Sequence, residues 1–455
     1  MSQTINPFNL NHTIIQSAVI HNDNYKEDIL PFINAYEFTQ SLFSPTIYGS
    51  LTINDSNDLL GNKFFNTNGE NFVTISIRNV EDIVFEYKFI LADIDLEIKG
   101  EIADSAIVVV SLISPDFFRN SYMLKSKGYV NLTISEMIKR ILKEELNSTI
   151  KYQELNDPRE SYTEQEATVT FAFTKIRPFE KIEILKNQAF GESDSVASTF
   201  LFYETINGYN FISYEHIINN TYSVKNPPNY VYSENMSAEK FRNPLYLGIK
   251  SFEATPRNNN LNRVINGMFS SEIYRFDFNT KRITVQEFNL DDDIKKFKNI
   301  YNDETINLSY TEQFAKDVRE NGKYTYFIPW DSSVGRNDMS YKHFQYSRPF
   351  INLLDENTLN IFVDGNLKLN LGDLITTTIW KNKMRFDKSD DYVDNRYSGK
   401  YIIQALNNTI YKGEMQGVWY HDTSISLIRD FTPLENVTPN NANNRSGTTQ
   451  FTRPD

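Results

Sequence analysis

Hydrophobic and polar residues alternate in short segments along the first quarter of the chain. In residues 72–78, Val73, Ile75 and Ile77 occupy every second position and therefore lie on one face of an extended backbone. Further segments of this kind, separated by turn-forming residues, lie at 50–55, 85–90, 93–99 and 107–113. Short strands at this spacing are typical of a β-sandwich or a small barrel. We predict an all-β unit over residues 1–116.

The next part of the chain has helical periodicity as well as strands. Apolar residues three and four positions apart predict a helix over 132–146, where Thr133 and Glu136 have the spacing of an N-terminal capping box. A second helix is predicted near 178–189, because apolar residues recur there at the same spacing.

A hairpin follows these two helices. The dipeptide Asn207-Gly208 is typical of a type I′ turn, and it lies between apolar segments at 200–205 and 209–214. Together with a short strand at 168–173, these elements predict an α+β module over residues 117–237.

The β pattern returns after residue 238 and is interrupted once. Strands are predicted at 248–253, 264–269, 271–277, 282–288, 358–363, 371–380, 399–406 and 416–429. We therefore predict a second β unit in two parts, 238–290 and 351–433, around an inserted module at 291–350. Residues 434–455 are polar and lack periodicity, which predicts a flexible C-terminal tail. The fold class predicted for the whole chain is mainly β with α+β insertions.

Charge and composition exclude several classes of protein. The chain has 455 residues, with 46 Lys and Arg against 59 Asp and Glu, a net charge of −13. This balance argues against a phosphate-binding surface, because lysine and arginine supply most of the affinity for DNA. The absence of cysteine excludes disulfides, thiolate metal sites and cysteine nucleophiles. No apolar run approaches 18 residues, so no membrane-spanning segment is expected.

The search for catalytic and metal-binding motifs finds none. The five histidines, which are scattered and lack metal-ligand spacing, are His12, His21, His216, His343 and His421. No nucleophile elbow, Walker or zinc-protease motif occurs. The acidic runs at 387–395 and 291–293 lack the order of a calcium loop and are interpreted as solvated loops. We expect no catalytic residue, cofactor or metal ion.

One predicted strand carries an unusual series of acids. In residues 92–99, Asp93, Asp95 and Glu97 alternate with isoleucine and leucine, which places the three carboxylates on one face if the alternation is unbroken. An ordinary solvated strand face is the default interpretation. The functional alternative is an acidic wall, which becomes relevant if the sheet lines a channel.

Four strings resemble the central hub family of contractile-tailed bacteriophage baseplates, which is related to the hub part of type VI secretion spike proteins. They are PTIYGSLTINDSNDLLGNKFFNTNGENFVTISI at 45–77, STFLFYETINGYNFISYEHI at 198–217, NIFVDGNLKLNLGDLITTTI at 360–379 and GKYIIQALNNTI at 399–410. They occur in the order of the family and fall where the pattern predicts strands and turns.

The resemblance implies a fold and a function. The family has two tube-type antiparallel β-barrel domains with inserted α+β modules, and three copies form a ring that adapts a three-fold spike to the six-fold tail tube. It implies a virion protein of the tail baseplate, assembled in the host cytoplasm, with no enzymatic activity. Its expected partners are two further copies, a separate spike protein, tail tube or tube-initiator proteins and neighbouring baseplate proteins.

In such a ring DNA is a passenger that moves through the lumen during ejection without being bound. Asp93, Asp95 and Glu97 would then face either the lumen or bulk solvent. Two alternative functions stay open: a tail-associated peptidoglycan hydrolase, and a carbohydrate-binding tail adhesin, for which the aromatic content of 14% is the argument.

Overall fold

The structure is a computed structural model of the chain. It describes residues 13–55, 70–79, 83–99, 106–152, 169–189, 199–232, 246–256, 264–265, 267–293, 297, 299–301, 312–330, 345–347, 349, 351, 357–380, 393–394, 396–413 and 418–430. The predicted C-terminal tail at 434–455 lies outside these residues. The fold is mainly β with α+β insertions, as the sequence predicts.

The first β unit is a single antiparallel sheet in the order β3-β4-β7-β6-β5-β1-β2. Its elements are β1 (Ile14–His21), β2 (Lys26–Asp28), the 3₁₀ turn η2 (Leu30–Phe32), β3 (Ile33–Ser41), β4 (Tyr48–Asp55), β5 (Phe72–Arg78), β6 (Val84–Lys99) and β7 (Ala106–Ile113). The alternating residues Val73, Ile75 and Ile77 are buried, as predicted. The segments predicted separately at 85–90 and 93–99 form one continuous strand, β6.

This first unit differs from the predicted barrel in one respect. Side chains of β1 and of β3, such as Ile20 and Tyr36, belong to the same buried cluster, so the sheet curls around a common core. Among the described strands, however, β2 and β3 do not pair with each other, because β3 pairs on its outer side with a strand of the second unit. The first unit is therefore an open, curled sheet.

The second β unit is a closed six-stranded barrel in the order β18-β12-β13-β17-β20-β19, closed by the pairing of β18 with β19. Its strands are β12 (Asn229–Tyr232), β13 (Tyr246–Pro256), β17 (Asn357–Asp364), β18 (Leu374–Ile379), β19 (Gly399–Lys412) and β20 (Trp419–Arg429). The prediction of a purely antiparallel barrel is wrong at β12, which runs parallel to both of its neighbours. Parallel neighbours need a long connection, and residues 233–245 supply one between β12 and β13.

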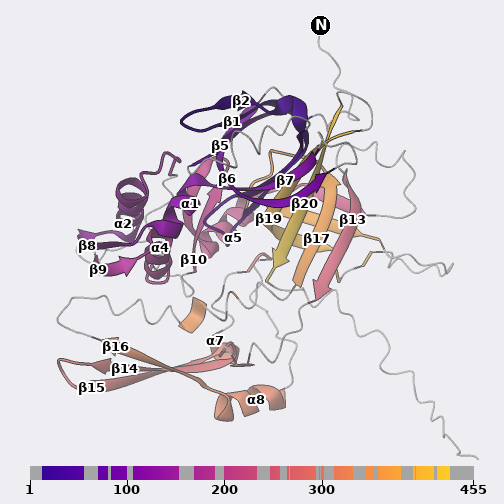
Figure 1. Ribbon diagram of the computed structural model, residues 1–455. Coiled ribbons are helices and arrows are strands. Elements are labelled where there is room, and N and C mark those ends of the chain that lie inside the picture. The colour runs from indigo at the N-terminus through magenta and orange to yellow at the C-terminus, as the bar shows by residue number, and fades with distance from the viewer. Residues whose placement is uncertain are drawn as a thin grey trace, which may run out of the picture.

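The two β units form one continuous sheet. Strand β3 pairs with β19 from Ala405 opposite Ser41 to Tyr411 opposite Ala35. In Figure 1 the strands of the second unit accordingly stand beside those of the first.

The α+β module lies against the first unit. It contains α1 (Pro115–Tyr122), β8 (Lys125–Leu132), α2 (Ile134–Arg140), the π-helical turn η4 (Ile141–Glu145), β9 (Val169–Ile176), α4 (Pro178–Lys186), β10 (Phe200–Thr205), β11 (Gly208–Ser213) and α5 (Tyr214–Ser223). Both predicted helices are present, and the Thr133 side chain accepts a hydrogen bond from the Glu136 N–H at 3.2 Å, as the capping box requires. The predicted hairpin is present, but the predicted type I′ turn at Asn207-Gly208 is wrong. Thr205 pairs with Gly208, so Ile206 and Asn207 form the turn, and Asn207 lacks the positive φ that a type I′ turn requires.

Two helices of this module are absent from the sequence prediction. Pro115 is the first residue of helix α1 rather than only the end of a strand, since proline is tolerated where its missing N–H has no helical partner. Helix α5 is capped by the Ser213 hydroxyl, which accepts a hydrogen bond from the His216 N–H at 3.2 Å.

The inserted part of the chain forms a separate three-stranded sheet in the order β15-β14-β16. Its elements are β14 (Ser270–Asp277), β15 (Arg282–Asn289), α7 (Leu290–Asp293), α8 (Glu312–Asn321) and β16 (Tyr324–Trp330). In Figure 1 this sheet lies below the large sheet, with α8 at one end.

The strand pairings of this small sheet correct two predictions. The boundary predicted at residue 290 divides strands that pair with one another, because β14 and β15 share a sheet with β16 and not with β13 or β17. The strand predicted at 264–269 is also wrong: residues 264–265 are helical, and Gly267 has φ +71° in a turn.

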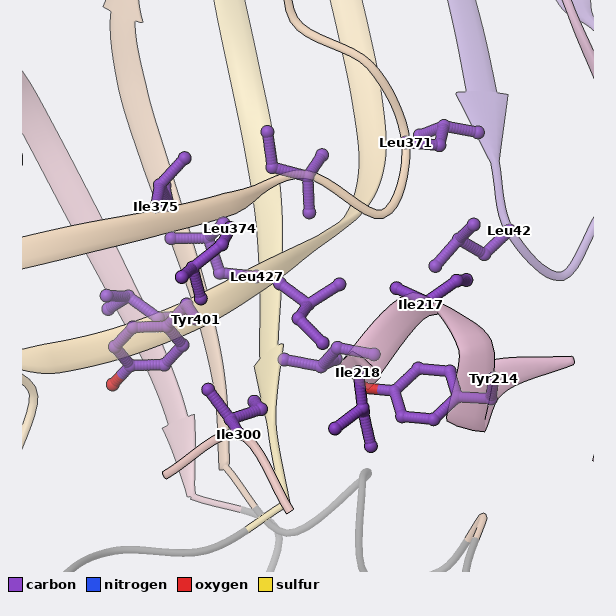
Figure 2. Packing of buried hydrophobic residues seen from close by; sticks show 14 of the residues in the cluster. Leu42, Tyr214, Ile217, Ile218, Ile300, Leu371, Leu374, Ile375, Tyr401 and Leu427 are labelled. Atoms are coloured by element: carbon purple, nitrogen blue, oxygen red, sulfur yellow. The ribbon is translucent and has the colours of Figure 1, made fainter. Parts of the chain in front are cut away.

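Helix α5 packs against buried apolar residues of the closed barrel. Figure 2 shows Ile217 and Ile218 of α5 beside Leu427 of β20, and Leu42, which follows β3, belongs to the same cluster. The largest core therefore contains residues from the first unit, the α+β module and the barrel. Buried apolar contacts therefore connect all three parts, and the pairing of β3 with β19 in addition connects the first unit to the barrel.

Candidate assembly surface

The acidic segment of β6 lies on an irregular part of the sheet. The pairing of β6 with β7 shifts between Leu91 and Asp93 and again between Ile94 and Leu96. Asp93 is exposed and lies opposite Ser111, whereas Glu97 lies opposite Val108.

These shifts bear on the prediction that three carboxylates share one face. Ser111 and Val108 are an odd number of positions apart on β7, so the strict alternation that the prediction assumes is interrupted by the bulges. The side chains of Asp95 and Glu97 lie outside the described residues. That the segment faces a lumen stays a prediction.

The other half of β6 has one acid, Glu86, and one base, Lys88, and therefore no net charge. The Lys88 Nζ lies 3.7 Å from the centroid of the Phe72 ring, and His21 stacks on the same ring at 5.4 Å. Burial and the nearby Lys88 and Lys26 lower the pKa of His21. The acidic character therefore does not extend along the whole strand.

A buried carboxyl group that the sequence interpretation missed lies where the first unit meets the α+β module. Glu204 of β10 is fully buried, and its Oε2 accepts a hydrogen bond from the Ile47 N–H at 3.2 Å. The Tyr87 hydroxyl of β6 donates to Oε1. Burial raises the pKa of Glu204 to about 8. A single acid within the apolar string FLFYET was the available sequence signal for this site.

A second buried acid stands next to this one. Asp116 of α1 accepts hydrogen bonds from the Ser148 and Tyr209 hydroxyls, the latter at 3.2 Å, and lies 3.5 Å from the Arg119 guanidinium. Burial raises the pKa of Asp116, while these partners oppose the rise. The junction between the two parts is thus a buried polar network in which one acid has a cation beside it.

His421 is a structural histidine of the barrel. Its ring nitrogens lie 2.8 Å from the Thr13 hydroxyl and 3.0 Å from the Asn408 Oδ1. Burial lowers the pKa of His421 to about 4, so the ring is neutral at physiological pH. His216 has its backbone in the cap of α5, and His12 and His343 lie outside the described residues.

Gly365 is expected to be essential for the packing around His421. A Cβ at this position would lie 2.0 Å from the His421 Cγ, and the Gly365 N–H donates to the His421 carbonyl at 2.8 Å. We expect Gly365→Ala to lower the free energy of unfolding by about 1–3 kcal/mol, as overpacking of a core does. Urea unfolding measures this, with Gly128→Ala as the matched control, where the nearest atom is 4.0 Å away. If both variants lost the same free energy of unfolding, the loss in Gly365→Ala would not come from a collision with the His421 ring.

The acidic runs and the remaining candidate metal ligands lie only in part within the residues that the structure describes. These residues contain no group of three or more histidine and acidic side chains that could hold a metal ion. Asp293, interpreted as part of a solvated loop, is instead at the end of α7 and accepts a hydrogen bond from Tyr346 at 3.2 Å. Of the acidic run at 387–395, residues 393–394 alone are described. None of the described helices has the length and apolar character needed to span a membrane.

The comparisons with known proteins concern the fold. No family model and no curated protein matches the sequence. Among solved structures, the chain is similar to the tail protein from Neisseria meningitidis MC58, with a TM-score of 0.50 and 10% identity over 91% of this chain and 96% of that one. It is also similar to the 43 kDa tail protein of prophage MuSo2 from Shewanella oneidensis, with a TM-score of 0.48 and 11% identity over 91% of this chain and 98% of that one.

The likeness to the Neisseria protein covers nearly the whole of both chains, and it shows a shared fold. The class that can be stated is therefore one of fold: the chain has the fold of this tail protein. The resemblance to the baseplate hub family seen in the sequence is confirmed at the level of the fold.

Proposed function

We propose that the protein is the central hub of a contractile tail baseplate, in which three copies form a ring between a three-fold spike and the six-fold tail tube. The observation that carries the proposal is the presence of two β units side by side in one chain, joined by the pairing of β3 with β19. Three such chains supply six β units, and a closed ring satisfies sheet edges that would otherwise be exposed. The fold shared with a tail protein supports the same conclusion.

In this ring DNA passes through the lumen and is not held there. The net charge of −13 supports this part of the proposal, because phosphates are repelled by a surface of their own sign. Of the three acids Asp93, Asp95 and Glu97 of β6, the exposed Asp93 is the proposed contribution to the lumen wall, because the register with β7 does not place Glu97 on the same face. A map of the assembled ring that buries the Asp93 side chain between subunits would overturn this assignment.

The mass of the protein in solution tests the proposal. We expect light scattering to give three times the 53.0 kDa of the chain, and cryo-electron microscopy of the same particles to show six β units around one axis. Particles that stay monomeric at all concentrations, or that contain another number of copies, would contradict the hub. A fall in turbidity of purified cell walls would instead support the hydrolase.

A further inference from the structure

The two β units share one arrangement of four strands. The sheet order is β3-β4-β7-β6 in the first unit and β13-β17-β20-β19 in the second. Within each set the strands also follow one another along the chain in the same order, when the strands between them are left aside. By this order β13 corresponds to β3, and β19 corresponds to β6.

The registers of the two sets agree down to their bulges. Strand β3 skips Asn34 in its pairing with β4, and β13 skips Lys250 in its pairing with β17. Strand β6 skips Ala92 opposite β7, and β19 skips Gln404 opposite β20. Bulges at matching places are specific features of a fold, so they show which residues of the two sets correspond.

One contact joins the two sets inside the chain. Strand β3 pairs with β19 beyond the residues that pair with β18. The matching place on β6 is residues 93–99, beyond the part that pairs with β5, and no described strand pairs with them on that side. On β13 the matching edge is residues 251–256, and among the described strands β12 reaches residues 246–248 alone. Each chain thus has one filled and one unfilled version of the same contact.

Corresponding residues are more exposed where the contact is unfilled. Leu406 of β19, next to β3, is 2% exposed, whereas the corresponding Ile94 of β6 is 36% exposed. Tyr36 of β3 is buried, whereas the corresponding Phe252 of β13 is half-buried. A neighbouring strand at each unfilled edge would cover these apolar side chains, as the pairing of β3 with β19 does inside the chain.

The two unfilled edges have compatible directions. Every neighbouring pair is antiparallel from β6 through β7, β4, β3, β19, β20 and β17 to β13. Because these are eight strands, the first and the last run in opposite directions. Strand β6 of one copy would therefore meet β13 of another as an antiparallel pair, as β19 meets β3. In Figure 1, β6 and β13 accordingly lie on opposite sides of β19 and β20.

We propose that β6 of one copy pairs with β13 of the next copy, in the register that β19 and β3 have inside the chain. The inference rests on the proposed ring and names the strands through which its subunits meet. The contact is heterologous and closes into a ring when the rotation between copies permits. The eight strands of each of three copies then form one antiparallel wall of 24 strands.

Two details of the strands bear on this contact. Pro256 has no backbone N–H, so the pairing on β13 is expected over residues 251–255. Backbone groups at the sheet edges make the contact, so the side chain of Asp93 stays on a face of the wall.

The absence of cysteine permits a direct test with the full chain. In the proposed register Glu253 of one copy lies opposite Ile98 of the next, as Glu37 lies opposite Thr409 inside the chain. Within one chain Ile98 and Glu253 are seven strand spacings apart, about 34 Å along the sheet, which is beyond the reach of a disulfide.

The variant Ile98→Cys/Glu253→Cys is oxidised as the purified protein, with Glu37→Cys/Thr409→Cys as the matched control. We expect covalent dimers and trimers on a denaturing gel from the first variant. The control is expected to run as a monomer that has lost both free thiols, because its two positions face each other within the chain. Each single-cysteine variant is expected to stay monomeric on the gel.

The other outcomes separate this contact from the proposed function. Trimers by light scattering that yield no covalent species from Ile98→Cys/Glu253→Cys, while the control forms its disulfide, would overturn the strand contact and leave the hub intact. Covalent dimers from a single-cysteine variant would also overturn the strand contact, since they report a two-fold contact. Monomers in both measurements would contradict the strand contact and the hub together.

Amide hydrogen exchange gives an independent measurement on the unaltered chain. We expect the backbone of residues 94–98 and 251–255 to exchange at least tenfold more slowly in the assembled ring than in single chains obtained by dilution. Residues 35–39, which pair on both sides within one chain, are the matched control and are expected to exchange equally in both states. Unchanged exchange at residues 94–98 and 251–255 on assembly would contradict the proposal.

Discussion

Replacing Lys181 by methionine is expected to lower the free energy of unfolding by about 3–5 kcal/mol, since it leaves an unpaired carboxylate inside the protein. The Lys181 Nζ lies 2.6 Å from the Glu145 Oε2, and the two side chains are 0% and 1% exposed. The Tyr129 hydroxyl donates to the other carboxylate oxygen at 2.5 Å. Chemical denaturation with urea measures the loss.

Two further variants separate the ion pair from the packing around it. The double variant Glu145→Gln/Lys181→Met removes both charges and keeps an amide oxygen for Tyr129, so it is expected to recover most of the stability. Glu144→Gln removes the neighbouring ion pair between Lys127 and Glu144, whose side chains are 36% and 43% exposed. Its expected loss is at most about 1 kcal/mol, as for exposed pairs. A loss below 1 kcal/mol in Lys181→Met would contradict the prediction.

The buried Glu204 is expected to make the protein less stable as the pH rises from about 4.5 to 8. Its pKa is about 8 in the folded protein against an ordinary value of 4.5, because burial disfavours the charged form. Between these values the unfolded chain has released the proton and the folded chain has kept it, so each step in pH favours unfolding. Below 4.5 the effect is absent, and above 8 it is complete, on the order of 5 kcal/mol.

Glu204→Gln tests this dependence, because an amide does not titrate. The variant loses one acceptor, for the Ile47 N–H or the Tyr87 hydroxyl, and is expected to be less stable than the natural protein by about 1 kcal/mol at pH 4.5. At pH 8.5 the order reverses. Asp430, whose pKa is raised to about 7 by burial, contributes a slope of the same sign in both proteins, so the difference between their curves isolates Glu204. Parallel curves from pH 4.5 to 8.5 would overturn the assignment.

The sequence predicts the local elements well where one physical rule determines them. Alternation identified β5, and the capping residue Thr133 identified the start of α2. Both features depend on residues close together in the chain. The bulges of β6 were not predictable in this way, because they depend on which residues of β7 lie opposite.

The local sequence pattern also could not predict which strands belong to which sheet. Strands β14 and β15 have the composition of barrel strands, and their membership in a separate sheet follows from pairing with β16, about fifty residues further on. Likewise Glu204 was inconspicuous as one acid among 59. What distinguishes it is its contact with Ile47 and Tyr87, residues more than a hundred positions away in the chain.

The pairing of β3 with β19 has a consequence for how the chain folds during synthesis. The pairing joins residues about 370 positions apart, as in the hydrogen bond between Asn407 and Glu37. At synthesis rates of about 5–20 residues per second, β19 emerges from the ribosome roughly 20–70 s after β3. During that interval the outer edge of β3 has no partner. The first unit therefore keeps one unpaired edge until β19 has been synthesised.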